Sequence, residues 1–349
     1  ALYMLAIAKS PRALADREVV RWQAAGQDTH TQLAAVAQRK SGTVRVQIDF
    51  VAAGNSDQPS PGPEQSTPVQ RHLKVNGVPR RTSDVVGEIN AVMFGAPDLE
   101  LVLGPPVVRR RYLDILTSQI EHTYLTVLQR YQRVVSQRNH LLKSLREGRS
   151  KPSELEFWDD ELAASGGHLM ARRAETVLML SRQAAPAYRG LVGGDDGLQI
   201  RYRPSVEIEP DATEEDIRRL LKTSMHQQRD RELAQGFTVF GPHRDDLQIL
   251  LGNTDAATYA SRGECRTVAL AMKLAEASYL KDRRGQEPVL LLDDVLSELD
   301  ESRRAHVLER ASDFEQCLVT TTDVELIDER YLPRTTGFAV SSGRVTPIS

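Results

Sequence analysis

One segment, residues 289–300, restricts the possible folds of this chain more than any other. It reads VLLLDDVLSELD: apolar residues run directly into two adjacent carboxylates, Asp293 and Asp294, and a short acidic turn ends at Asp300. An unbroken apolar run of this kind is typical of a strand that is covered on both faces of a parallel sheet. We therefore expect a buried strand that ends in two like charges.

Two adjacent buried carboxylates are costly unless a cation neutralises one of them. Ligands of open α/β sheets bind at the carboxyl ends of the strands, and Mg²⁺ is the ordinary cation for an all-oxygen site beside phosphates. The pattern favours a magnesium–nucleotide site, with one carboxylate on the metal and the second, kept off the metal, orienting or activating a water. From these residues alone, the alternative that both acids only cap the next helix stays open.

A second motif precedes this strand in the chain. The segment 261–276, SRGECRTVALAMKLAE, is a loop that runs into an apolar helix, with Ser261 and Gly263 at the junction. Exposed amides, a small hydroxyl and the positive end of a helix suit a phosphate. A Ser-x-Gly sequence alone is too common to indicate a phosphate site. Its position before the acidic strand makes it specific, and we therefore expect phosphate binding at Ser261 and Gly263.

The remaining patterns predict an α/β protein with a helical middle. Residues 1–8 indicate an apolar helix that is broken at Pro11, and 30–52 and 70–78 indicate strands, with an Asn-Gly hairpin turn. A Pro-, Gly- and Ser-rich loop is expected at 54–68. Helical spacing predicts one helix over 106–148, a second region over 157–188 that is loosened at Gly166-Gly167, and a third that begins near 211. After Gly236, strands and helices alternate and a strand pair ends the chain.

Composition excludes some functions and leaves others open. No apolar run approaches the ~20 residues that cross a bilayer. The two cysteines, Cys265 and Cys317, suit a reducing cytosol, so we expect a cytoplasmic protein. Net charge is −3, but residues 106–151 hold ten Lys or Arg residues against three acids. That segment is either a phosphate-binding patch or a solvated helix face.

Four segments together resemble the RecF family, bacterial recombination mediators among the ABC/SMC-type ATPases. They are SRGECRTVALAMKLAE, VLLLDDVLSELD, GPHRDDL and LVLGPPVVRRRYLD, and the resemblance runs in order along nearly the whole chain. It implies an α/β fold: an ABC-ATPase-like head of the P-loop NTPase type with an inserted α-helical arm lobe. The head would comprise 1–105 and 236–349, and the arm 106–235.

The resemblance also implies roles for single residues. Ser261, Gly263 and Arg266 match the signature motif, which contacts the γ-phosphate of a nucleotide held by a second subunit. Asp300 matches the D-loop aspartate, which crosses the interface of an ATP-dependent homodimer. We therefore expect ATP and Mg²⁺ as cofactors.

Four further positions match the subunit's own nucleotide site. Asp293 matches the Walker B ligand of Mg²⁺, and Asp294 stands at the position of the catalytic acid. Thr322 stands where many ABC ATPases have a switch histidine. Asp98, in FGAPDL at 94–99, matches the Q-loop region, although the proline there is displaced by one residue.

By resemblance, the function is loading of recombinase on single-stranded gaps, with roles in replication restart and the SOS response to DNA damage. The implied partners are single-stranded and gapped duplex DNA, RecR and RecO. Arg109, Arg110 and Arg111 are the candidates for DNA contact. Their alternative role is to pair with acids of the chain, such as Asp114, and we expect this for at least one of them.

An ATPase of this kind needs a phosphate loop, Gly-x-x-x-x-Gly-Lys-Ser/Thr, and the chain contains no Gly-Lys pair. In the family this loop precedes the helix that residues 1–8 resemble. We therefore expect that roughly forty upstream residues are missing from this sequence, and that the chain alone does not bind ATP.

Two other classes of function remain as alternatives. The first is a DNA- or protein-binding module that uses the fold without turnover. The second is a metal-dependent nuclease whose carboxylates are Asp293, Asp294, Asp245 and Asp246. His243 and Arg244 of GPHRDD are expected to be structural, because a lone histidine is more often a packed or hydrogen-bonded residue than a catalyst.

Overall fold

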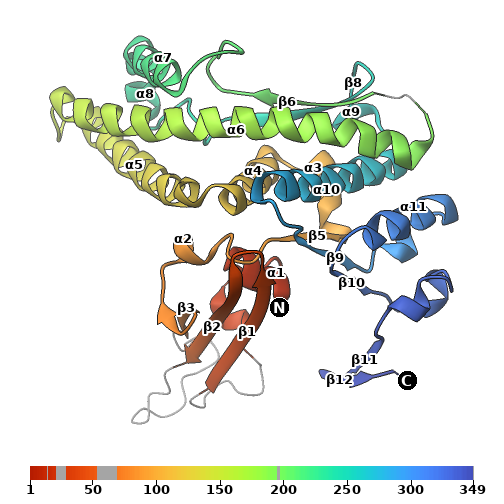
Figure 1. Ribbon diagram of the computed structural model, residues 1–349. Coiled ribbons are helices and arrows are strands. Elements are labelled where there is room, and N and C mark those ends of the chain that lie inside the picture. Colours follow the sequence, from red (N-terminus) through yellow and green to blue (C-terminus); the bar gives the residue numbers. More distant parts are fainter. Residues whose placement is uncertain (14, 21–28, 53–68, 195–196, 349) are drawn as a thin grey trace.

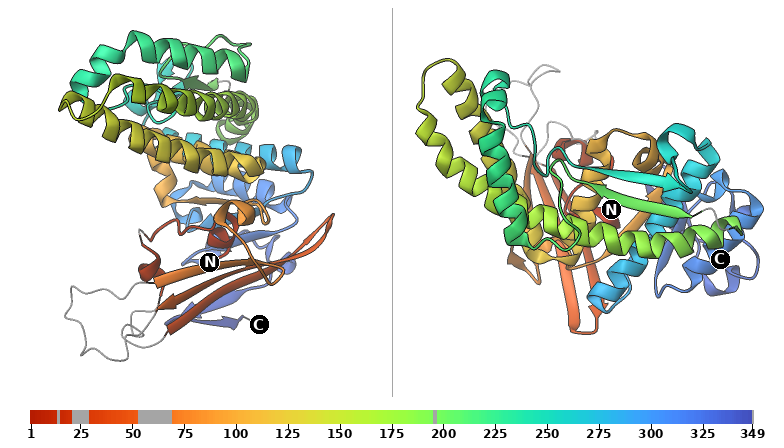
Figure 2. Two further views of the ribbon diagram at one scale, coloured as in Figure 1. Left: turned by 90° about the vertical axis from the view of Figure 1, so that its left-hand side faces the viewer. Right: turned by 90° about the horizontal axis from the view of Figure 1, so that it is seen from above.

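The computed structural model describes residues 1–13, 15–20, 29–52, 69–194 and 197–348. The predicted loop at 54–68 lies outside these residues. Figure 1 shows an antiparallel sheet near the N-terminus, a parallel sheet at the centre, and a helical arm that lies across both. Figure 2 shows the same arm from the side and from above, projecting beyond the parallel sheet.

The antiparallel sheet has the order β1-β2-β3-β4 and follows the predicted strands. Its strands are β1 (Thr29–Arg39), β2 (Gly42–Ala52), β3 (Val69–Val75) and β4 (Val78–Pro79). Asn76 and Gly77 both have positive φ, 51° and 80°, as the tight hairpin turn requires. Val46, Ile48 and Phe50 point into a core shared with α1 (Leu2–Ile7), η1 (Asp16–Val19) and α2 (Thr82–Val85).

The parallel sheet has the order β10-β9-β5. These strands are β10 (Cys317–Thr320), β9 (Val289–Asp293) and β5 (Ala91–Gly95). Leu290 and Leu292 of β9 are buried in the same core as α10 (Arg262–Arg284), whereas Val289 and Leu291 pack toward α1. The prediction of a strand covered on both faces is confirmed for β9. Strand β10, by contrast, lies at the sheet edge, with Leu318 41% exposed.

The helical arm departs from the predicted helices in two places. Its elements are α4 (Pro106–Ile120), α5 (His122–Arg146), η4 (Pro152–Glu154), α6 (Leu155–Val192), α7 (Glu214–Gln227) and α8 (Arg229–Gln235). The single helix expected over 106–148 is wrong, because Glu121 is extended (φ −118°, ψ 113°) and separates α4 from α5. The second helix is also not loosened at its glycines: α6 runs unbroken through Gly166 and Gly167.

The reason for these glycines is close packing. A Cβ on Gly167 would lie 3.1 Å from the Glu214 carbonyl oxygen and 3.2 Å from the Arg218 amide nitrogen, both in α7. A Cβ on Gly166 would lie 3.0 Å from the Leu221 side chain. Glycine therefore lets α7 approach the backbone of α6, and the helical propensity lost there is offset by packing.

The remaining elements complete the head and its edges. They are η3 (Ala96–Leu99), α3 (Glu100–Leu103), β6 (Leu198–Arg203), β7 (Asp246–Leu251), β8 (Thr254–Asp255), α9 (Ala256–Tyr259), η5 (Leu296–Glu298), α11 (Glu301–Ser312), η6 (Val324–Leu326), η7 (Leu332–Arg334), β11 (Phe338–Ser341) and β12 (Arg344–Pro347). One core joins residues of all three predicted parts, among them Phe94, Leu180 and Leu270. The division at 105 and 235 stays a prediction. Within the described residues, no helix is long and apolar enough to cross a membrane.

Candidate functional site

Three parallel strands end side by side at the acidic segment. Asp293, the last residue of β9, is paired in register with Gly95 of β5 and Thr320 of β10. The Thr320 hydroxyl donates to Asp293 Oδ1 at 2.9 Å, and the Arg12 guanidinium contacts Oδ2. The Asp293 side chain remains 30% exposed. A carboxylate is thus held in place at the strand end and is open to solvent on one side.

Asp294 leaves the sheet at once. It has a positive φ of 56°, and its amide donates to the Thr320 carbonyl oxygen at 3.1 Å. This turn directs the Asp294 side chain into solvent, where Ser297 Oγ lies 3.4 Å from its Oδ1. The expectation of two adjacent buried carboxylates is therefore wrong: Asp293 is half-buried, Asp294 is exposed, and the chain separates them by turning.

The donor set at this strand end fits a hard cation. Asp293 already attracts one cationic group, Arg12, and the hydroxyl of Thr320 is within hydrogen-bonding distance. Carboxylate and hydroxyl oxygens are ligands that Mg²⁺ accepts, usually together with waters and phosphate oxygens. The residues present therefore fit the predicted metal position at Asp293.

Asp98 lies at the end of the neighbouring strand β5. Its Oδ2 accepts a hydrogen bond from the Gly95 amide at 2.8 Å, so that the carboxylate closes the turn that follows the strand. Burial raises the pKa of Asp98, and the nearby Lys273 ammonium opposes this shift. Asp98 thus lies at the same carboxyl end of the sheet as Asp293, but its hydrogen bond to Gly95 stabilises its own turn and does not connect it to Asp293.

The signature-like segment begins helix α10. Ser261 is the N-cap: its Oγ accepts from the Glu264 amide at 3.2 Å, and Glu264 Oε2 accepts from the Ser261 amide at 2.7 Å. The amides of Arg262 and Gly263 stand in the first turn, where a helix has no internal acceptors. A Cβ on Gly263 would meet nothing nearer than Ser261 Oγ at 4.0 Å, so no packing within the chain explains this glycine.

The start of α10 is joined to the acidic turn after β9. Arg266 forms an ion pair with Glu298 Oε2 at 2.9 Å and also donates to the Glu298 carbonyl oxygen at 3.2 Å. Asp300 caps α11 by accepting from the Arg303 amide at 2.9 Å, and this bond lowers the pKa of Asp300. The signature-like and D-loop-like segments therefore form one exposed surface, with Arg266 between them.

Two contacts at Asp293 have no counterpart among the sequence predictions. Thr322, the predicted position, is exposed beyond the end of β10, whereas Thr320 bonds to Asp293. The sequence Thr320-Thr321-Thr322 predicts a threonine near Asp293, but only the strand register determines that Thr320 is the one that bonds to it. Arg12 lies 281 residues away from Asp293, and no local pattern predicts that contact.

Of the three arginines proposed for DNA contact, two are engaged within the chain. Arg109 is buried and forms two bonds to Asp246, at 2.7 and 2.9 Å, while Arg110 donates to the Asp245 carbonyl oxygen at 2.8 Å. The proposed DNA contact is therefore wrong for Arg109 and disfavoured for Arg110, because their donors serve the junction of arm and head. The expectation that at least one of the three pairs with an acid of the chain is confirmed for Arg109, although its partner is Asp246 and not Asp114. Arg111 is exposed.

The GPHRDD segment lies in a buried polar cluster that we call the junction network. It consists of Asp114, Tyr124, Tyr131, Arg173, Tyr202, His243 and Asp245. Arg173 bonds to Asp114 at 2.8 Å and to the Pro242 carbonyl oxygen at 2.6 Å. Asp245 accepts from the Tyr202 hydroxyl and from the Ser205 amide. These bonds tie α4, α5 and α6 of the arm to the start of β7.

His243 has a structural place in this network. Its Nε2 lies 3.2 Å from the Thr238 carbonyl oxygen, which can only accept, so the Tyr131 hydroxyl donates to Nδ1 at 2.6 Å. Burial lowers the pKa of His243 to about 4, and the nearby Arg244 guanidinium contributes. This neutral, doubly bonded histidine agrees with the prediction that it is structural.

The nuclease alternative needs four carboxylates in one place. Asp245 and Asp246 are instead bound to Tyr202 and Arg109 at the junction, away from the end of β9. Among the residues that the structure describes, no group of three or more His, Cys, Asp or Glu side chains is placed to hold a metal ion. The proposed four-carboxylate cluster is therefore wrong.

Known proteins similar to this chain agree with the geometry. No protein-family model matches it. The DNA replication and repair protein RecF of Chloroflexus aurantiacus is 40% identical over 354 residues, which covers 99% of this chain and 89% of that protein. The RecF protein of Halalkalibacterium halodurans is 36% identical over 344 residues, covering 98% and 87%.

Solved structures give the same result. A structure described as the recombination mediator protein RecF-ATPrS in the RecFOR pathway has a TM-score of 0.85 at 27% identity, covering 99% of this chain and 87% of that one. The corresponding RecF-ATP structure has a TM-score of 0.84 at 27% identity, covering 99% and 86%. With relatives at this identity and coverage, and with the fold shared throughout, the chain belongs to the RecF family of DNA replication and repair proteins.

Proposed function

We propose that this protein is an ATP-dependent, DNA-binding recombination mediator. The observation that carries the proposal is the end of β9, where Asp293 is fixed by Thr320 and Asp294 turns into solvent. The names of the relatives and the RecF-ATP and RecF-ATPrS structures support it. Loading of recombinase at single-stranded gaps, replication restart and the SOS response would be its cellular roles, in the cytoplasm, with RecO and RecR as partners.

At the site, Asp293 would hold Mg²⁺, which when bound would neutralise charge on the phosphate oxygens. The Asp294 carboxylate is exposed and forms no ion pair with the described residues, so its oxygens are free to orient a water or to accept its proton. Asp98 would fix the turn beside the metal, and Thr322 would approach from the loop after β10.

The second half of the site would come from another copy of the chain. Ser261 and the first-turn amides of α10 point outward, and Gly263 leaves the approach free of side chains. An anion is attracted to such a helix end. A nucleotide held at Asp293 of one subunit would meet Ser261 and Gly263 of the other, with Arg266 and Asp300 beside it. Nucleotide would thereby join two subunits into a dimer.

The test uses the full-length protein with any residues encoded upstream of residue 1 (the upstream-extended protein), because residues 1–349 contain no Gly-Lys pair. Light scattering with ATP and Mg²⁺ would follow dimerisation, and a fluorescent ATP analogue would follow binding. We expect Ser261→Arg to bind the analogue as tightly as wild type but to remain monomeric. A Ser261→Arg protein that dimerises normally would contradict the shared site. Failure of the wild type to bind ATP would favour the alternative, a binding module without turnover.

A further inference from the structure

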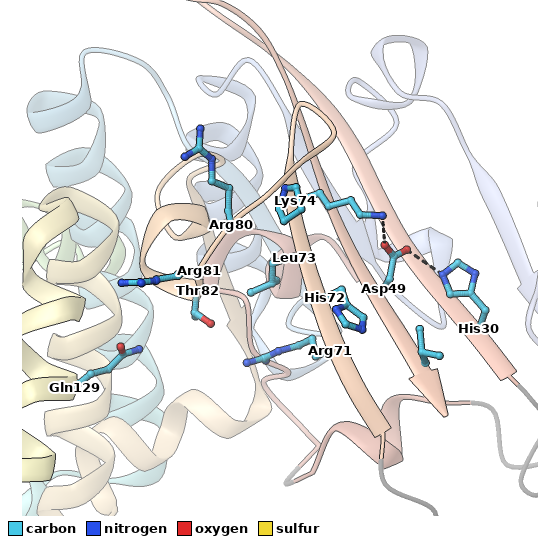
Figure 3. A pocket seen from close by; sticks show the side chains of 12 residues that line it. His30, Asp49, Arg71, His72, Leu73, Lys74, Arg80, Arg81, Thr82 and Gln129 are labelled. Carbon is cyan, nitrogen blue, oxygen red and sulfur yellow. Dashed lines mark hydrogen bonds and ion pairs between the residues drawn. The ribbon is translucent and has the colours of Figure 1, made fainter. Parts of the chain in front are cut away.

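An open groove lies on the side of the antiparallel sheet that faces the arm. It has a volume of about 730 Å³ and follows β3, the β4–α2 turn and one side chain of α5, Gln129 (Figure 3). Strand β3 pairs with β2 along its whole length, but with β4 only at Lys74 and Val75. The edge of β3 from 69 to 73 is therefore free of a strand partner among the described residues, and the groove runs beside it.

The lining of the groove is strongly cationic. It includes Arg71, Lys74, Arg80 and Arg81, together with His30 and His72, against a single acid, Asp49. Figure 3 shows Lys74 and His30 pointing toward Asp49, whereas Arg71 and Arg81 extend toward the side on which Gln129 lies. Polyanions are attracted to grooves of one sign, because the low-dielectric walls focus the field.

The one acid does not offer an anionic surface. Asp49 is only 4% exposed and accepts from Gln32 at 2.9 Å, Gln47 at 2.8 Å and Lys74 at 3.1 Å, with His30 also 3.1 Å away. Burial by itself raises the pKa of Asp49, but these donors together lower it far below its usual value. Asp49 thus stays charged and holds Lys74 and His30 in position at the rim.

The arginines differ in how they are held. Arg71 is held by residues of the N-terminal segment: its Nη1 donates to the Ala8 carbonyl oxygen at 2.7 Å and lies 3.7 Å from Asp16 Oδ1. Arg80 and Arg81 are exposed, and no described residue forms an ion pair with either guanidinium. These two side chains can therefore bind an incoming anion without breaking a bond that the fold uses.

The cationic surface continues onto the arm. Arg133 follows Gln129 by one helical turn on α5, so both lie on the same side of the helix. Its only described hydrogen bond is to the Gln129 carbonyl oxygen, at 3.3 Å, and it is exposed. An elongated ligand in the groove would meet Arg81, then Gln129, then Arg133.

We propose that this groove binds the sugar–phosphate backbone of duplex DNA. The proposal rests on the DNA-binding function proposed above and names a second surface for it, separate from Arg111. Guanidinium groups match phosphate oxygens in geometry. Among the residues that the structure describes, the groove lining contains no Phe, Tyr or Trp, so these residues offer no platform on which unpaired bases could stack, as single-strand sites do. The same lack of aromatic anchors disfavours a protein ligand.

The experiment compares two double variants of the upstream-extended protein with the wild type. Arg80→Ala/Arg81→Ala removes two charges from the groove, and Arg218→Ala/Arg219→Ala removes two charges from α7, where Arg219 is exposed and Arg218 is half-buried. Binding to a fluorescent gapped duplex is measured by anisotropy from about 50 to 200 mM salt. We expect the groove variant to bind about 10- to 30-fold more weakly, with a salt slope smaller by about 2, since each lost phosphate contact removes about 0.9. The α7 variant should bind as the wild type does.

Equal affinities and slopes for the groove variant and the wild type would overturn the proposal, as would an equal loss in the α7 variant. Loss of polyglutamate binding with DNA binding unchanged would instead assign the groove to an acidic protein segment. Failure of the wild type to bind DNA at all would remove the proposed function itself. Unaltered ATP-analogue binding and melting temperature in the groove variant exclude misfolding as the cause of its loss.

Discussion

Two of the four adjacent aspartate pairs in the sequence, 245–246 and 293–294, lie in different environments. Asp245 and Asp246 are bound within the junction: Asp245 is 1% exposed beside Tyr202 and Arg173, and Asp246, whose side chain is 30% exposed as that of Asp293 is, forms two bonds to Arg109. At the end of β9, Asp293 keeps one side open and Asp294 is exposed. Both pairs have the same Asp-Asp sequence, but the hydrogen-bond donors that surround them differ.

This difference separates a structural carboxylate from an available one. A buried carboxylate must be fully bonded, so the fold supplies donors from several elements and the group has no remaining capacity. A carboxylate at a strand end can leave its oxygens to solvent and to ligands. The junction network therefore holds the arm to the head, whereas the end of β9 is placed to act on something that comes from outside.

The largest effect should follow from breaking the junction network. Arg173→Met leaves Asp114 and Asp245 buried with a missing partner, and we expect a loss of about 3–5 kcal/mol in the free energy of unfolding. Urea denaturation followed by circular dichroism measures it. Asp294→Asn serves as the control and should change stability by less than about 0.5 kcal/mol. A loss under about 1 kcal/mol for Arg173→Met would mean that the junction is not held by this network.

A pair of glycine substitutions sharpens the same contrast. Gly167→Ala drives a methyl group into the backbone of α7 and should cost about 1–3 kcal/mol. Gly263→Ala meets open space in the first turn of α10 and should be neutral or stabilising by up to about 1 kcal/mol. Thermal unfolding of both proteins decides the matter. A destabilised Gly263→Ala would show that this glycine serves the fold, not an external ligand.

The smallest effect concerns pH. The pKa of His243 is lowered from 6.5 to about 4, so the folded protein favours the neutral ring and the unfolded chain binds the proton more tightly. Stability from this group is complete well above pH 6.5 and is lost as the pH falls toward 4, with about 2 kcal/mol lost by pH 5. His243→Gln should have a flatter profile than wild type between these pH values. Parallel profiles would contradict the neutral assignment.

Local patterns predicted much of this fold. The run 289–292 predicted a strand because its apolar residues are consecutive, and the apolar segment after Ser261 and Gly263 predicted the helix α10. The Asn76-Gly77 turn was likewise predictable, since few residues accept its backbone angles.

Contacts between distant segments could not be predicted in this way. The break at Glu121 and the continuity of α6 through Gly166 and Gly167 depend on the helices packed against them. The partners of Arg109 and Asp293 come from residues 137 and 281 positions away. The tertiary fold determines which distant residues come together. The sequence patterns therefore identified Arg109 and Asp293 as charged groups of interest, but not the residues that they bind.

The central claim is that the open carboxylates of β9 act on ATP, whereas those of GPHRDD do not. The most direct test measures ATP turnover and ATP-dependent dimerisation of the upstream-extended wild type and its Asp294→Asn variant. We predict that the variant binds ATP and dimerises, while turnover falls by at least about 100-fold, as expected on loss of a general base. Turnover at the wild-type rate in Asp294→Asn would contradict the assignment of this strand end as the catalytic site.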